Sequence, residues 1–307
     1  MKILYVGCVK GSVLKLKYVL ESGGDVVCVV TLDPSLKERH SDYAAFDGIC
    51  NKKNVPLLKI RDINAPSSFE LIKNIGPDII FVFGWSQMVK RPLLDLPRMG
   101  IIGFHPTILP ENRGRHPITW ALINGQDKTG ATFFFMDEKV DSGDIIAQQS
   151  IAVDFEDDAS TLMKKVNDVS RKLIHDFMPK LINKTIERIP QDNSKATYLR
   201  KRTKKDGYID WKRSAVEIYN LVRGLTRPYC GASAFYNNKE IIIWKCRILP
   251  DIFNDAPATI IDFSKDTITV QTKGGALELL DAEIDNQPID AVINTIRAKH
   301  IKTLEII

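Results

Sequence analysis

The stretch "PDIIFVFGWSQMVKRPLLDLPRMGIIGFH", residues 77–105, contains two short apolar runs separated by a polar segment rich in proline. "PDIIFVFGW" and "GIIGFH" are continuous apolar runs bounded by Gly and Pro, a pattern typical of strands that are covered on both faces. Between them, "RPLLDLP" predicts a short helical turn. The stretch therefore predicts two strands of a buried sheet, with His105 as the last residue of the second one.

The same alternation continues toward the N-terminus. Apolar runs at residues 2–9, 23–33 and 55–60 predict further strands, and segments 11–22, 44–54 and 69–76 between them predict helices. Strand and helix alternate for more than a hundred residues, which is the pattern of a doubly wound, mostly parallel, Rossmann-like α/β sheet. Ligands of such sheets bind beyond the carboxyl ends of the strands. "FGW" and "FHP" both lie at such ends.

The second half of the chain changes its pattern. A helix is predicted at 118–126, a hairpin of strands at 130–138 and 143–153 with an acidic tip, and a long helix at 158–186 capped by Asp158 or Ser160. Pro190 and the polar stretch "QDNSKATYLRKRTKKDG" predict a linker. A helix at 210–225, strand-rich segments to residue 284 and a last helix follow. We therefore predict a catalytic domain over 1–200 and a smaller C-terminal module over 201–307, OB-like or a short sheet.

Composition excludes several classes of protein. The 307 residues are 44% hydrophobic and 26% charged, which is ordinary for a soluble globular chain, and no apolar run reaches the length of a membrane span. The net charge of +5 suits an anionic small molecule or simple solubility equally well. Five cysteines without a CxxC pair predict reduced, buried thiols in a cytoplasmic protein.

His105 is the first candidate catalytic residue. A histidine on a strand is commonly a core residue, but His105 precedes "PTILPENRGRHP", a Pro-, Gly- and Arg-containing loop of the kind that faces a ligand. Its unperturbed pKa range suits a general base or acid. Asp137, Asp141 and Asp144 in "MDEKVDSGD" form either a solvated turn or a second part of this site. We expect no metal there, because no ligand set of known spacing accompanies them.

Two further segments could contact a ligand. Trp85 is read as a core residue, while Gly84, Ser86 and Gln87 around it permit backbone approach at the sheet edge. "GCVKGS", residues 7–12, is similar to a phosphate-binding glycine loop but lacks the spacing of either known fingerprint.

The motifs of residues 75–150 together resemble the enzymes that take a formyl group from N10-formyltetrahydrofolate. In order, they are the His with its "TILP" loop, "RGRHP", "WALING", "TGAT" and "VDSGDI". That family includes methionyl-tRNA, glycinamide ribonucleotide and sugar N-formyltransferases. The segment "TYLRKRTKKDGYIDW" and the strands after it resemble the C-terminal module of the methionyl-tRNA and sugar enzymes. The resemblance implies catalytic roles for His105 and Asp141. It implies N10-formyltetrahydrofolate as co-substrate, without a metal, at Gln87, Met88, Val89, Thr107, Ile108, Leu109, Pro110, Arg115, Asp137, Glu138, Lys139 and Val140.

One position departs from the family pattern. Two residues before the His the family usually has an Asn that donates a hydrogen bond to the formyl oxygen, and this chain has Gly103. Loss of one oxyanion donor typically lowers turnover by on the order of 10²–10³. A backbone N–H, a water or Asn112 could replace it. A catalytically impaired folate- or nucleotide-binding homologue is the alternative.

The acceptor is predicted from the same resemblance. Methionyl-tRNA formyltransferases carry a Gly-rich basic insertion after the second strand, and residues 31–56 contain none. The basic cluster at 200–213 is read as a solvated linker, so we expect no nucleic-acid or membrane partner. We predict a nucleotide-linked amino deoxysugar as acceptor, as in lipopolysaccharide O-antigen biosynthesis, and a homodimer. Methionyl-tRNA is the alternative acceptor.

Overall fold

Two short apolar strands, β1 (Lys2–Val6) and β4 (Ile79–Val82), pair in parallel inside a seven-stranded sheet. The computed structural model describes residues 1–39, 42–249, 255–264, 266–298 and 301–305. The strand order is β3-β2-β1-β4-β5-β7-β8, with β2 (Asp25–Leu32), β3 (Leu57–Ile60), β5 (Ile101–His105), β7 (Lys128–Phe135) and β8 (Ile145–Ala152). The first five are parallel, whereas β7 and β8 are antiparallel. The predicted doubly wound, mostly parallel sheet is confirmed.

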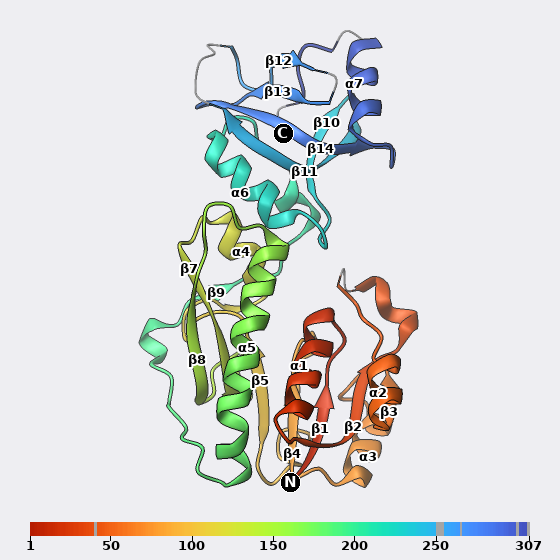
Figure 1. Ribbon diagram of the computed structural model, residues 1–307, viewed down its shortest axis with the longest axis vertical. Coiled ribbons are helices and arrows are strands. Elements are labelled where there is room, and N and C mark those ends of the chain that lie inside the picture. The colour runs from red at the N-terminus through yellow and green to blue at the C-terminus, as the bar shows by residue number, and fades with distance from the viewer. Residues whose placement is uncertain (40–41, 250–254, 265, 299–300, 306–307) are drawn as a thin grey trace. The chain divides into compact units, whose positions relative to one another are not determined.

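Helices cover both faces of this sheet (Figure 1). On one face, Lys15 of α1 (Lys10–Glu21) lies over the Phe104 ring, and Phe177 of α5 (Ala159–Ile182) packs on Phe133. On the other face, Ile72 of α3 (Pro66–Ile75) joins an apolar cluster with β1 and β4. The helix predicted at 44–54 begins only at Asp47 (α2, Asp47–Lys53), and "RPLLDLP" forms turns. A short 3-10 helix, η1 (Pro34–Arg39), follows β2.

Strand β5 positions the residues of interest by its alternation. Successive side chains of a strand point to opposite faces, so Gly103 and His105 share one face and Phe104 points to the other. Gly103 pairs with Phe134 and His105 with Thr132 on β7. Since β5 ends at His105, the imidazole stands where the chain leaves the sheet.

The predicted linker after α5 binds the first unit instead of running free. Ile189 exchanges two backbone hydrogen bonds with Ile145. Further along, β9 (Tyr198–Leu199) pairs in parallel with β6 (Arg113–Gly114), which belongs to the loop after His105. We call residues 189–199, which include the 3-10 turn η2 (Asn193–Lys195), the arm. The arm binds backbone groups and buried polar side chains, and such contacts leave no hydrophobic pattern in the sequence. Its polar composition is for this reason typical of a linker.

A second compact unit comprises residues 118–127, 153–162 and 201–307. It contains α4 (Pro117–Ile123, from Ile118 on), the 3-10 turn η3 (Lys204–Gly207), α6 (Ala215–Leu225), α7 (Ile289–Ala298) and a five-stranded antiparallel sheet of order β10-β11-β14-β13-β12. These strands are Ala232–Tyr236, Lys239–Leu249, Ala276–Ile284, Ile268–Gln271 and Ile260–Phe263. The strand-rich C-terminal module is thereby confirmed. The functional division at residue 200 stays a prediction.

Two sequence expectations concern thiols and membranes. Cys8, Cys28, Cys50 and Cys246 are buried, but Cys230 is exposed, so the expectation of buried thiols is wrong for that residue. Cys230 follows Pro228 and Tyr229 in the loop before β10, where no apolar run covers it. Within the described part of the chain, no helix has the length and apolar character needed to cross a membrane.

Candidate active site

The His105 side chain is buried, with 5% of its surface exposed, and both of its ring nitrogens face oxygen atoms. Nε2 lies 2.7 Å from the backbone oxygen of Asn112. A carbonyl oxygen only accepts hydrogen bonds, so Nε2 carries the hydrogen. In the neutral imidazole, Nδ1 then holds the free lone pair. The last residue of β5 thus presents one fixed N–H and one basic nitrogen.

Asp141 supplies the charge beside that basic nitrogen. Its Oδ2 lies 3.6 Å from His105 Nδ1, and the same oxygen accepts the backbone N–H of Gly114 at 2.8 Å. The carboxylate is 20% exposed, and the backbone of Asp141 has a left-handed φ of 50°. The predicted pair is therefore assembled from the β5 end and the β7–β8 connection, which lie 36 residues apart in sequence. A proton on Nδ1 would face a carboxylate held in place by a backbone amide.

The "TILP" loop is anchored to β7 and β8 beneath it. Thr132 Oγ1 donates to the backbone oxygen of Thr107 at 2.6 Å, and Gln148 Nε2 donates to that of Leu109 at 2.9 Å. The Thr107 and Leu109 side chains are buried, whereas Ile108 and Pro110 are half-buried. The loop is consequently rigid, and its buried members support the backbone more than they present side chains.

The predicted folate-binding triplet at 87–89 has three different environments. The Gln87 carboxamide accepts from the backbone N–H of Ile63 and donates to the oxygen of Arg61, both at 2.8 Å. Val89 is buried in the core, and Met88 is 42% exposed. Met88 is therefore the triplet's side chain that is open to solvent, while Gln87 ties this loop to the end of β3.

The other predicted binding residues lie in the loop after His105 and in the β7–β8 connection. Arg115 is exposed and donates to the backbone oxygen of Ser86 at 2.8 Å, which joins the loop after His105 to the loop after β4. Asp137 Oδ1 accepts from the Lys139 backbone and from Ser142 Oγ. Val140 is 38% exposed.

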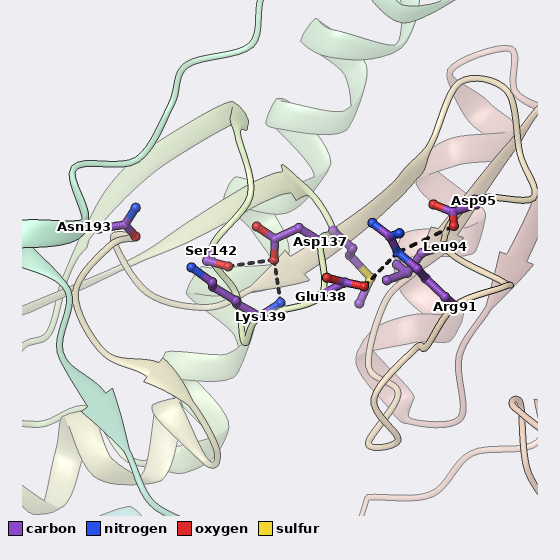
Figure 2. A pocket seen from close by; sticks show the side chains of 9 residues that line it. Arg91, Leu94, Asp95, Asp137, Glu138, Lys139, Ser142 and Asn193 are labelled. Carbon is purple, nitrogen blue, oxygen red and sulfur yellow. Dashed lines mark hydrogen bonds and ion pairs between the residues drawn. The ribbon is translucent and has the colours of Figure 1, made fainter.

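A pocket of about 390 Å³ lies between these loops (Figure 2). Figure 2 shows Glu138 and Arg91 facing each other across an ion pair of 2.7 Å, with Lys139, Ser142 and Asn193 on the opposite side. The complete lining is Arg91, Leu94, Asp95, Met136, Asp137, Glu138, Lys139, Ser142 and Asn193. Asp137, Glu138 and Lys139 were predicted to contact a ligand, and here they line a cavity.

Gly103 stands against packed side chains. A Cβ placed on it would lie 2.9 Å from Phe134 Cζ, closer than real Cβ contacts, and 3.0 Å from Met136 Cγ, tighter than most of them. The space that an Asn side chain would need is thus taken by β7 and its continuation. The Asn112 carboxamide forms no hydrogen bond with another described residue, so its donors are not engaged within that part of the chain.

Sequence reasoning missed four residues around the site. Arg91 and Asn193 line the pocket. Arg113 is buried within the loop after His105, and Gln191 is buried between that loop and the Asp141 loop. Arg113 had one available signal, an arginine within a Pro- and Gly-rich loop. Gln191 and Asn193 had none, because they belong to a polar stretch whose partners lie 48 to 80 residues away.

Buried charge occurs on the opposite face of β5 as well. Lys15 is 3% exposed, donates to Asn167 Oδ1 at 3.0 Å and lies 4.1 Å from the centroid of Phe104. Burial lowers the pKa of this amine to about 7. Over the described residues, no group of three or more His, Cys, Asp or Glu side chains could hold a metal ion.

Comparison with known proteins decides the family. The family model described as formyl transferase matches residues 8–178, and that of the formyl transferase C-terminal domain matches residues 201–298. The chain belongs to the formyl transferase family. Members of this family transfer one-carbon formyl groups and use formyl-tetrahydrofolate, and the resemblance noted from the motifs is confirmed.

Individual relatives differ in their named substrates. A methionyl-tRNA formyltransferase of Caldanaerobacter subterraneus subsp. tengcongensis is 33% identical over 286 residues, covering 92% of each protein. Two solved structures share the fold. One is WlaRD, a sugar 3N-formyl transferase in the presence of dTDP and 5-N-formyl-THF. Its TM-score is 0.69 at 17% identity, and the match covers 94% of this chain and 98% of WlaRD. The other is the Helicobacter canadensis N-formyltransferase in complex with folinic acid and dTDP-3-aminofucose. Its TM-score is 0.69 at 17% identity, and the match covers 92% of this chain and 100% of that enzyme.

Proposed function

We propose that this formyl transferase moves the formyl group of N10-formyltetrahydrofolate to the amine of a nucleotide-linked amino deoxysugar. The observation that carries the chemistry is the His105–Asp141 pair at the end of β5, with Nε2–H on the Asn112 carbonyl and Nδ1 3.6 Å from Asp141 Oδ2. This arrangement leaves one basic nitrogen beside a carboxylate.

His105 Nδ1 takes the role of proton carrier. As the acceptor nitrogen forms its bond to the formyl carbon, that nitrogen must lose a proton, which Nδ1 receives. Asp141 stabilises the resulting imidazolium, since the carboxylate lies at ion-pair distance. The bond from the formyl carbon to N10 then breaks, and Nδ1–H returns the proton to N10. The products are the formamide of the acceptor and tetrahydrofolate, so protons and atoms balance.

The pocket of Figure 2 suits the donor. Met136 and Leu94 offer apolar surface, whereas Ser142 and Asn193 offer hydrogen-bonding groups. Arg91 is paired with Glu138 and Asp95. Lys139 is therefore the cation of this lining that can meet a carboxylate of the folate tail. We infer from this lining that Arg91, Asp137, Glu138 and Lys139 border the folate, together with Met88, Arg115 and the "TILP" loop.

The composition of the segment after β2 supports a nucleotide sugar as the acceptor. The segment between β2 and α2, residues 33–46, contains no glycine and more acidic than basic residues, which is a poor surface for an RNA backbone. A nucleotide sugar needs only a few cationic contacts for its diphosphate. Methionyl-tRNA is the second candidate, and the 33% identity to a methionyl-tRNA formyltransferase over 92% of both chains favours it. Binding without turnover is the third, motivated by Gly103.

Tetrahydrofolate release distinguishes the three. The protein is incubated with N10-formyltetrahydrofolate and either a panel of dTDP-, UDP- and GDP-amino sugars or methionyl initiator tRNA. Release with a sugar supports the proposal, release with the tRNA alone replaces it, and release with neither leaves the binding role. With the tRNA, KM should rise steeply with salt because many phosphates are contacted, whereas a diphosphate acceptor gives a shallow dependence.

A matched pair of variants tests the proton carrier. We expect His105→Gln to lower kcat by about 10²–10⁴, because the site loses its general base and acid. His175 on α5 is exposed beside Asp176, so His175→Gln is the control and should leave kcat unchanged. Full turnover in His105→Gln would remove His105 from the mechanism. The homodimer and the cytoplasmic location remain part of this proposal.

A further inference from the structure

The arm meets the two loops of the active site through one buried carboxamide. Gln191 is 8% exposed, and its side-chain hydrogen bonds to described residues all go to those loops. Its Nε2 donates to the backbone oxygens of Asp141 at 3.0 Å and Gly143 at 2.7 Å. Its Oε1 accepts from Arg113 Nη2 at 2.7 Å and from Nε at 3.2 Å. One side chain therefore joins the Asp141 loop to the loop that follows His105.

Arg113 is the partner that makes this connection rigid. It is 1% exposed, and its guanidinium also donates to Asn193 Oδ1 at 2.8 Å and to the Tyr198 hydroxyl at 3.0 Å. Within the described part of the chain, its hydrogen-bond partners are thus neutral groups of the arm. A buried guanidinium held only by neutral oxygens is costly to disturb, because any lost hydrogen bond leaves a desolvated cation unsatisfied. The arm and the loop are consequently locked to each other.

The neighbours of Arg113 in sequence contact the catalytic pair. The oxygen of Asn112 accepts Nε2–H of His105, and the N–H of Gly114 donates to Oδ2 of Asp141. The arm also binds the backbone here, since Thr197 accepts the N–H groups of Asn112 at Oγ1 and of Arg113 at its backbone oxygen. His105, Asn112, Arg113, Gln191 and Asp141 form a closed ring of contacts around the imidazole.

We propose that Gln191 is a positioning residue for formyl transfer, which holds the Asn112 carbonyl and the Asp141 carboxylate in register on the two nitrogens of His105. This role rests on the proposed function of His105. Gln191 touches no reacting atom. It acts by fixing the distance between two loops, and a displacement of about 1 Å in such a site can lower turnover on the order of 10²-fold.

Two variants separate positioning from stability. Gln191→Glu offers a carboxylate to Arg113 and retains the guanidinium contact, but it cannot donate to the oxygens of Asp141 and Gly143. Gln191→Met removes both contacts and leaves the guanidinium without two of its hydrogen bonds. We expect the unfolding midpoint to fall clearly in Gln191→Met and much less in Gln191→Glu. We expect kcat to fall 10- to 100-fold in both, with KM for the formyl donor changed less than threefold.

The protonation of the His105 ring nitrogens detects the loss of positioning without any formyl acceptor present. In ¹⁵N spectra of histidine-labelled protein, assigned with His105→Gln, the wild-type His105 signals should show hydrogen on Nε2. Both Gln191 variants should shift these signals toward a mixture of tautomers, because the Asn112 carbonyl no longer holds one. Asp192→Asn, at the exposed neighbour on the arm, is the control and should leave kcat and the spectrum unchanged.

The outcomes are distinguishable. A kcat loss that tracks the unfolding midpoint, large in Gln191→Met and absent in Gln191→Glu, would make Gln191 structural only. Unchanged His105 signals in both variants would overturn the positioning role outright. The wild type could transfer no formyl group to any acceptor while the His105 signals still shift in the Gln191 variants. The proposed function would then fail, and the positioning of His105 by Gln191 would stand.

Discussion

Gly103 and Asn112 illustrate how single residues set the chemistry available at this site. Phe134 and Met136 fill the space beside Gly103, so the usual Asn cannot simply be added back to this chain. Asn112 lies 2.7 Å from His105 through its backbone oxygen, has a left-handed φ of 59° and keeps its carboxamide free of other described residues. We infer that this carboxamide is the donor for the formyl oxygen.

Asn112→Gly tests this donor. Glycine adopts the same φ and keeps the backbone carbonyl on Nε2, while the N–H donors disappear. We expect kcat for formyl transfer to fall by on the order of 10²–10³. Asn54 has a φ of 52° at the end of α2, and Asn54→Gly is the matched control. Unchanged turnover in Asn112→Gly would assign the formyl oxygen to a backbone N–H or a water.

At the scale of elements, helix α1 buries a lysine against the sheet. Lys15 reaches Asn167 of α5 and the Phe104 ring, and burial lowers its pKa from 10.5 to about 7. The folded state therefore binds fewer protons than the unfolded state between these two values. The cost of burying the charged amine is fully present below about pH 7 and disappears as the pH rises toward 10.5.

Lys15→Met removes this dependence. We expect the variant to be more stable than the wild type at pH 7, and the difference to shrink as the pH is raised to 9. The shrinkage should approach about 1.4 kcal/mol per pH unit at most. Urea unfolding at pH 7, 8 and 9 measures it. Lys17→Met, at an exposed lysine of the same helix, is the control. Parallel curves for the wild type and Lys15→Met would contradict the lowered pKa.

At the scale of the whole molecule, the thiols divide by burial. Burial raises the pKa of Cys8 and Cys246 to about 12 and of Cys28 and Cys50 to about 11. Thiolate is the reactive form, so these four should stay silent toward a disulfide reagent in the folded protein. Cys230 is exposed.

Titration of the native protein with an aromatic disulfide at pH 8 should therefore release one equivalent of thiolate rapidly. Cys230→Ser should abolish that release, and the denatured wild type should release five equivalents. A second rapid equivalent from the native wild type would show that one of the buried thiols becomes exposed in solution.

The sequence by itself determined the fold class, because short apolar runs such as "PDIIFVFGW", bounded by Gly and Pro, favour buried strands, and their alternation with helices is typical of a doubly wound sheet. It also determined that His105 ends a strand and, through the order of motifs, the formyl transferase family. Only the tertiary structure decided which atoms surround the imidazole. Segments up to 86 positions apart bring together the Asn112 oxygen, the Asp141 carboxylate and the hydrogen-bonded pair of Gln191 and Arg113. Their hydrogen bonds are long-range and polar, and such contacts leave no periodic pattern in a chain. The arm, predicted as a linker, is the clearest case, since the partners that order it lie in loops near residues 113 and 141.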